Sequence, residues 1–121
     1  MASMSDEKNK PHRDLKERTK QFALAVIALY KLLPKTTEAQ VLGKQLLRSG
    51  TSVGANTRAA FRGRSKKDYV AKLGIVIEEA DESGFGLELL SDSGIMPLSA
   101  TEALHNEANE LVPIFTSLVK R

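Results

Sequence analysis

The sequence predicts an all-α protein, an antiparallel up-down-up-down four-helix bundle. Apolar residues recur at helical spacing in four segments, each bounded by a capping pattern, a proline or a glycine. Alternation with a period of two is absent over any useful length, so we expect no sheet. Because the connections are short, helices that follow each other in sequence should lie antiparallel.

The first two helices are separated by Pro34. The first is expected from about residue 12 to residue 33, because a residue before proline disfavours the α region. The second is expected from Thr37 to about Arg62, with a capping box in which Thr37 caps and Gln40 reaches back. Gly63 suits the position just after its end. The apolar faces comprise Leu15, Phe22, Val26, Leu29 and Leu33, then Leu42, Leu46, Ser49, Val53, Thr57 and Ala60.

The last two helices have similar boundary signals. The third is expected to open with Ser65 as its cap and to end at Gly94. The fourth is expected to open with Ser99 as its cap, after Pro97, and Pro113 inside it should produce a kink. Their apolar faces comprise Tyr69, Leu73, Val76, Ala80 and Leu87, with Ile77 beside them, then Leu104, Ala108, Leu111, Phe115 and Leu118.

Length and composition suit one domain of 121 residues, with 41% hydrophobic residues. Residues 1–11 are polar and are expected to form a disordered N-terminal segment, which leaves residues 12–121 for the bundle. Cysteine is absent, which excludes disulfides and thiolate metal sites. No signal peptide is recognisable and the longest apolar run is far below the roughly 20 residues of a membrane span. We therefore expect a cytoplasmic protein with no membrane partner.

The charges are divided between two blocks of the sequence. Residues 44–72 contain eight basic residues and one acid, and residues 73–110 contain nine acids and no Lys or Arg. The formal net charge of +3 hides this division. Such a division indicates charge-directed packing, a polyanion partner, or both.

Part of the basic block lies on one side of the second helix. At about 100° per residue, four cations fall within an arc of about 80°, opposite the apolar face. We call this set the basic stripe: Lys44, Arg48, Arg58 and Arg62. It could be a solvated face, a surface that contacts phosphates, or a surface that meets an acidic neighbour. Aromatic residues are 5% of the chain, so binding of nucleic acid would use backbone phosphates rather than base stacking.

Other residues indicate helix–helix or subunit contacts. Gly43, Gly50 and Gly54 line one edge of the second helix, which predicts a close approach by another helix. Apolar residues away from the core faces, together with acids of the third helix, predict a head-to-tail homo-oligomer. These candidate interface residues are Leu24, Ile27, Ile75, Leu89, Glu78, Asp81, Glu82 and Glu88.

No catalytic or metal-binding pattern is recognisable. His12 and His105 lack a second ligand at metal spacing, and no Glu-x-x-His pair or glycine-rich phosphate loop is present. We therefore expect no enzyme activity, no metal and no cofactor.

Several short motifs match a known family in order and spacing. They are Leu33-Pro34-Lys35, Gln45-Leu46-Leu47-Arg48-Ser49, Ser52-Val53-Gly54-Ala55-Asn56-Thr57-Arg58, Arg62-Gly63-Arg64-Ser65 and Glu79-Ala80-Asp81-Glu82. With them the sequence resembles the bacterial four-helix bundle family of 23S rRNA intervening-sequence proteins, also called S23-like. The resemblance implies a homopentamer related to the accessory variability determinant of diversity-generating retroelements, which partners a reverse transcriptase and binds nucleic acid. By position, Arg48, Arg58, Arg62 and Arg64 match the basic positions of the family.

Two function hypotheses follow. The first is a non-enzymatic oligomeric accessory protein that binds RNA or DNA phosphates without sequence specificity, through the basic stripe and Arg64. The alternative is an oligomeric protein-interaction scaffold of unknown role, in which the stripe pairs with the acidic third helix of a neighbouring subunit. The partners expected are therefore further copies of the chain, RNA or DNA, and a partner protein.

Overall fold

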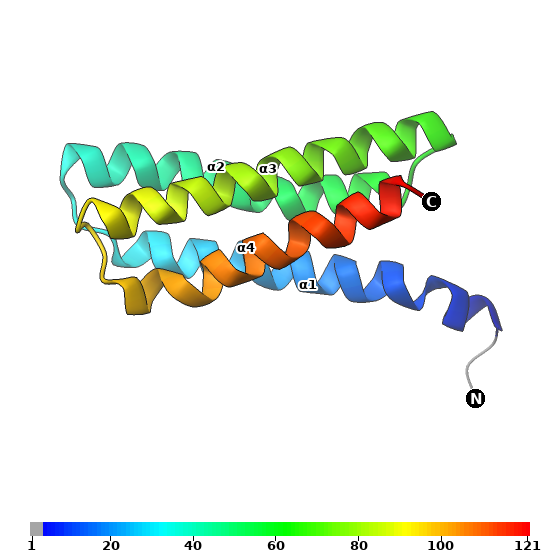
Figure 1. Ribbon diagram of the computed structural model, residues 1–121, viewed down its shortest axis with the longest axis horizontal. Helices are drawn as coiled ribbons and strands as arrows, with labels where there is room; N and C mark the ends of the chain where they lie inside the picture. Colours follow the sequence, from blue (N-terminus) through cyan, green and yellow to red (C-terminus); the bar gives the residue numbers. More distant parts are fainter. Residues whose placement is uncertain (1–3) are drawn as a thin grey trace.

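The computed structural model describes residues 4–121, with side chains from residue 12 onward. It contains four helices, α1 (Met4–Leu32), α2 (Thr37–Ala60), α3 (Lys66–Asp92) and α4 (Leu98–Val119), and no strand among the described residues. Successive helices run in opposite directions, which confirms the predicted up-down-up-down bundle (Figure 1). The start of α1, the α2–α3 turn and the C-terminus lie at one end of the bundle. No described helix is long and apolar enough to cross a membrane.

The first helix begins earlier than the sequence predicted. Residues 4–11 are helical, where a disordered segment through residue 11 was expected; the first three residues of that segment lie outside the described residues. The composition of this segment is therefore compatible with a helix as well as with disorder.

The cap of α2 was assigned to the wrong threonine. Thr36 is the N-cap residue, and its hydroxyl accepts a hydrogen bond from the Ala39 amide at 3.3 Å. Gln40 does not close a capping box: its amide donates to the Pro34 carbonyl at 2.8 Å and accepts from the Tyr30 hydroxyl at 3.1 Å. These bonds tie the start of α2 to the end of α1 and so set the register of the cap.

The other helix ends give a mixed result. Ser65 caps α3 by accepting from the Asp68 amide at 3.0 Å, as predicted. Gly94 follows the end of α3 with φ of 79°, a conformation that glycine adopts without strain. The assignment of Ser99 as cap was wrong, because Pro97 occupies the N-cap position of α4 and gives no side-chain bond. Gly63 is not left-handed, so its expected helix-terminating role was wrong as well.

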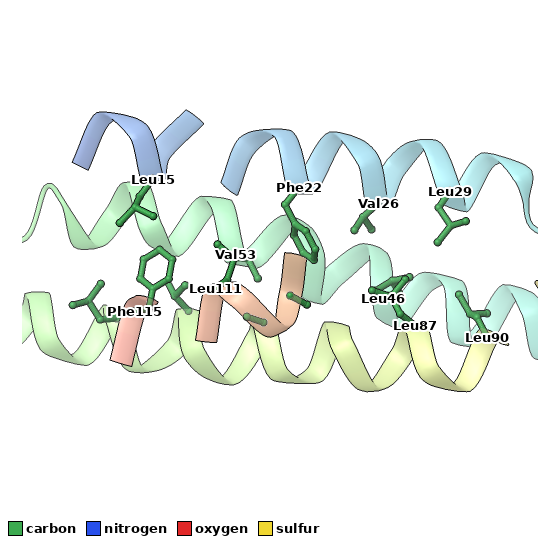
Figure 2. Packing of buried hydrophobic residues seen from close by; sticks show 14 of the residues in the cluster. Leu15, Phe22, Val26, Leu29, Leu46, Val53, Leu87, Leu90, Leu111 and Phe115 are labelled. Carbon is green, nitrogen blue, oxygen red and sulfur yellow. The ribbon is translucent and has the colours of Figure 1, made fainter. Parts of the chain in front are cut away.

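The core lies along the axis of the bundle and receives side chains from all four helices. The described part of the chain buries most of the predicted apolar faces, while Leu42, Tyr69, Ile77, Leu104 and Leu118 are half-buried at its edge. Figure 2 shows the buried side chains meeting between the helices. They include Leu15, Phe22, Val26 and Leu29 of α1, Leu46 and Val53 of α2, Leu87 and Leu90 of α3, and Leu111 and Phe115 of α4.

The glycine edge of α2 faces α1, as the sequence predicted. A Cβ at Gly50 would stand 2.8 Å from a methyl of Val26, and one at Gly54 would stand 3.3 Å from the carbonyl oxygen of Thr19. Thr19 is itself buried and donates back to the Leu15 carbonyl at 2.8 Å. The backbones of α1 and α2 therefore approach closely at this level, and this approach shapes the surface described next.

Candidate nucleic-acid interface

A shallow groove of about 380 Å³ lies between α1 and α2. Its floor consists of small residues, because α1 and α2 meet here through Gly54. Its rim carries cations from both helices. The lining residues are Lys16, Lys20 and Ala23 of α1 with Thr51, Gly54, Ala55, Arg58, Ala59 and Arg62 of α2.

Two helical pairs of cations form the rim. Lys16 and Lys20 are four residues apart, as are Arg58 and Arg62, so each pair projects from one face of its helix. Lys20, Arg58 and Arg62 are exposed to solvent. We call these four residues the groove cations.

The groove is electrostatically one-sided. None of the nine described residues that line it is acidic. Within residues 12–121, Arg58 and Arg62 form no ion pair. Guanidinium groups hold phosphates through paired, charge-assisted hydrogen bonds, and the small floor allows a chain of phosphates to approach both helices. The arrangement is therefore able to bind a polyanion without any catalytic group.

The basic stripe does not act as one surface. Arg48 turns to α3, where it donates to Glu79 at 2.9 Å and to Glu82 at 2.7 Å. The hydrogen bond to Glu82, with the charge of both acids, raises the pKa of Arg48 above its usual value. Lys44 is exposed on α2 outside the groove. Only the half of the stripe nearest the α2–α3 turn, Arg58 and Arg62, joins the groove.

Arg64 lies close in sequence to this half of the stripe. It is exposed in the turn between α2 and α3, at the end of the bundle where α1 begins and α4 finishes. Lys66, Lys67, Lys120 and Arg121 are also exposed at this end. The end of the bundle nearest Arg58 and Arg62 therefore carries additional positive charge.

The apolar residues of the predicted interface differ in their exposure to solvent. Leu24 is 47% exposed, while Ile27, Ile75 and Leu89 are half-buried. Phe85 of α3, which was not among the predicted interface residues, is 59% exposed, and Leu32, Val41 and Leu98 are exposed as well.

Two of the four predicted interface acids already have partners in the same chain. Glu82 pairs with Arg48, and Glu88 lies 2.9 Å from the Nε2 atom of His105. Glu78 and Asp81 are exposed and form no ion pair with a described side chain. Glu78 and Asp81 are therefore available for the expected ion pairs between subunits, whereas Glu82 and Glu88 would first have to give up their contacts within the chain.

A separate ion pair joins α1 to α4. Arg18 donates to both carboxylate oxygens of Glu107 at 2.7 Å and to Glu110 at 2.6 Å. The hydrogen bond to Glu107 is the main reason that the pKa of Arg18 lies above its ordinary value. Arg18 is therefore committed to packing, although it lies between Lys16 and Lys20 in sequence.

Lys16 and Lys20 were not among the site residues predicted from the sequence, because the first helix contributed only apolar residues to the predicted core and interface. A usable signal was present in the glycine edge of the second helix. Gly54 marks where another helix approaches, and Arg58 stands one turn further along the same helix. Basic residues of the helix that approaches Gly54 were therefore candidates to share a surface with Arg58. No cluster of three His, Asp or Glu side chains able to hold a metal occurs in the part of the chain that the structure describes.

The fold and the groove define a small helical-bundle protein with a cationic surface between its first two helices. Within that class, the chain belongs to the 23S rRNA-intervening sequence protein family, whose family model matches residues 13–117. This confirms the family resemblance seen in the sequence, while the link to the accessory variability determinant stays a prediction.

One solved structure is similar over nearly its whole length. It comes from Bacteroides thetaiotaomicron VPI-5482 and is described as a protein with unknown function from the S23 ribosomal protein family. It is 36% identical, the match covers 88% of this chain and 99% of that chain, and the TM-score is 0.82. No curated protein matches the sequence.

Proposed function

We propose that this protein is a non-enzymatic accessory protein that binds RNA or DNA through backbone phosphates at the α1–α2 groove. The observation that carries the proposal is the convergence of the four groove cations on one surface whose described lining contains no acid. Binding of this kind reads charge and shape rather than sequence and weakens steeply with salt. The proposal revises the sequence-based hypothesis by adding Lys16 and Lys20 and by leaving Arg48 to its intrachain pair.

Charge reversal tests the proposal directly. Arg58→Glu/Arg62→Glu should abolish binding of a fluorescent RNA at low salt, measured by anisotropy, while the helical circular dichroism stays unchanged. A matched control is Lys31→Glu/Lys35→Glu, because both lysines are exposed near the α1–α2 turn at the opposite end of the bundle. If the two double variants weaken binding equally, the groove is not the binding surface.

We further propose that the protein works as a homo-oligomer, with the predicted pentamer as the candidate assembly and a cytoplasmic location. The exposure of Leu24 and Phe85 supports an oligomer, because large apolar groups on the surface favour association. Light scattering gives the mass of the assembly. A monomer at all concentrations would contradict this part of the proposal.

The scaffold hypothesis remains the second candidate. It is favoured by the unpaired acids Glu78 and Asp81, which are available to a basic surface of another copy. Arg58→Glu/Arg62→Glu also separates the two functions: it should leave the oligomer intact if the groove binds nucleic acid, and dissociate it if the groove serves assembly.

A further inference from the structure

A cluster of aromatic rings lies beyond Lys16 and Arg62, at the end of the bundle where α1 begins. His12 of α1 stacks on Phe61 at the C-cap of α2, with ring centroids 4.0 Å apart and an angle of 10° between the planes. Tyr69 of α3 completes the cluster, 6.1 Å from Phe61 and 6.2 Å from His12. We call these three residues the ring cluster. Each of them keeps part of its surface exposed to solvent.

The ring cluster does not line the groove itself, but two of its members lie next to groove cations along α1 and α2. His12 precedes Lys16 by one helical turn, and Phe61 is bonded directly to Arg62. From Lys20 to His12 the helix rises by about 12 Å, which is the span of a few nucleotides of a strand. A strand held by its phosphates in the groove would therefore reach the rings with its next bases.

His12 and Phe61 cover one face of each other, and Phe61 and Tyr69 also pack against the core, so the rings are only partly exposed. Phosphate-binding cations followed by accessible aromatic ring faces are the combination that holds single-stranded nucleic acid. The cations track the backbone, and each ring offers a face on which an unpaired base stacks. A base inside a duplex is already stacked and paired, so it gains nothing from such a ring unless the duplex opens. A ring site beside the groove would therefore distinguish single strands from duplexes, which the groove cations alone would not.

We propose that the ring cluster of His12, Phe61 and Tyr69 is a base-stacking site that makes unpaired RNA or DNA the preferred ligand of the groove. The proposal rests on the proposed function and refines its ligand class. It departs from the expectation, drawn from the low aromatic content, that binding would use backbone phosphates rather than base stacking. Aromatic residues are few, but two of the six Phe and Tyr side chains and one histidine are gathered in this cluster.

His12 allows a clean test. It lies at the edge of the cluster, and its partial burial, with the nearby charge of Lys16, lowers the pKa of its imidazole. At neutral pH the ring is therefore uncharged, so His12→Ala removes a stacking surface without removing a charge. His12→Phe is the matched control, because it keeps an aromatic ring at the same place.

The experiment compares two fluorescent probes, a short oligouridine and an RNA duplex of equal length, by anisotropy at neutral pH. His12→Ala should weaken binding of the single strand about five-fold or more and leave binding of the duplex unchanged. His12→Phe should restore the single-strand affinity. A 2-aminopurine placed in the oligouridine should lose fluorescence on binding to the wild type and to His12→Phe, and less so on binding to His12→Ala.

The outcomes separate this inference from the proposed function. If Arg58→Glu/Arg62→Glu abolishes binding but His12→Ala affects neither probe, or both probes equally, the stacking site is refuted and the groove stands. If charge reversal in the groove changes neither probe, the proposed function fails first. A thermal melt of His12→Ala, monitored by circular dichroism, checks that the fold is retained.

Discussion

Neutralising two groove cations should change the salt dependence of binding by a calculable amount. Each phosphate contact with a single strand contributes about −0.7 to the slope of log association constant against log salt. If Lys16, Lys20, Arg58 and Arg62 each hold one phosphate, the groove contributes about −2.8 to that slope. Arg58→Gln/Arg62→Gln leaves two contacts and a contribution of about −1.4.

This difference is large over an accessible range of salt. Between about 50 and 200 mM, the groove contribution in the wild type lowers the association constant about 50-fold, and in the double variant about seven-fold. Contacts outside the groove add equally to both proteins, so the difference between the slopes is the measured quantity. Anisotropy titrations of an oligouridine at four or more salt concentrations give both slopes.

A matched neutralisation gives the control. Lys31→Gln/Lys35→Gln removes the same charge from the opposite end of the bundle and should leave the slope unchanged. Equal slopes for the wild type and Arg58→Gln/Arg62→Gln would refute the assignment of phosphate contacts to these arginines. Equal reductions in both double variants would show that net charge, rather than the groove, governs binding.

Three further predictions concern stability. Gly50→Ala should lower the free energy of unfolding by about 1–2 kcal/mol, because the added Cβ would stand 2.8 Å from a methyl of the buried Val26. Gly74→Ala should raise it by about 0.5–1 kcal/mol, because nothing lies within 4 Å of the added Cβ. Denaturant titration measures both changes, and a gain in stability at both sites would contradict the close approach of α1 and α2. Arg18→Gln should lower the free energy of unfolding by at most about 1 kcal/mol, since Arg18 is about a third exposed and water screens its ion pairs with Glu107 and Glu110. This decrease should be smaller in high salt, and a decrease that salt does not change would indicate lost packing instead of lost ion pairs. Burial and the charge of Lys16 lower the pKa of His12 in the folded state. The contribution of His12 to stability is therefore complete above its unfolded pKa of 6.5 and is lost as pH falls through its folded pKa. On acidification His12→Phe should lose less stability than the wild type, and an equal loss in the two proteins would contradict this.

The sequence was sufficient for the fold because burial follows periodicity. The stripes that contain Phe22, Val53, Leu73 and Phe115 are buried in the structure, since one face of each helix must be removed from water. The cap of α2 was less predictable. Thr36 and Thr37 are adjacent and both are good caps, and the choice between them depends on tertiary bonds of Gln40 that no local pattern contains.

The candidate site was only half predictable for a similar reason. A helical wheel treats α2 in isolation and places Arg48 and Arg58 within one arc, about 80° apart. In the bundle that angle is enough to turn Arg48 toward the acids of α3 and to leave Arg58 beside α1. Which cations share a surface therefore depends on the neighbouring helices, and Lys16 and Lys20 became candidates only when α1 was placed.

Mapping of the contact surface by NMR tests the central claim most directly. Single-stranded RNA added to the ¹⁵N-labelled protein at low salt should shift the backbone amides around Lys16, Lys20, Gly54 and Arg58, and leave those around Glu78 and Asp81 on α3 unchanged. Shifts that map to α3, or none at concentrations where anisotropy reports binding, would contradict a nucleic-acid interface between α1 and α2.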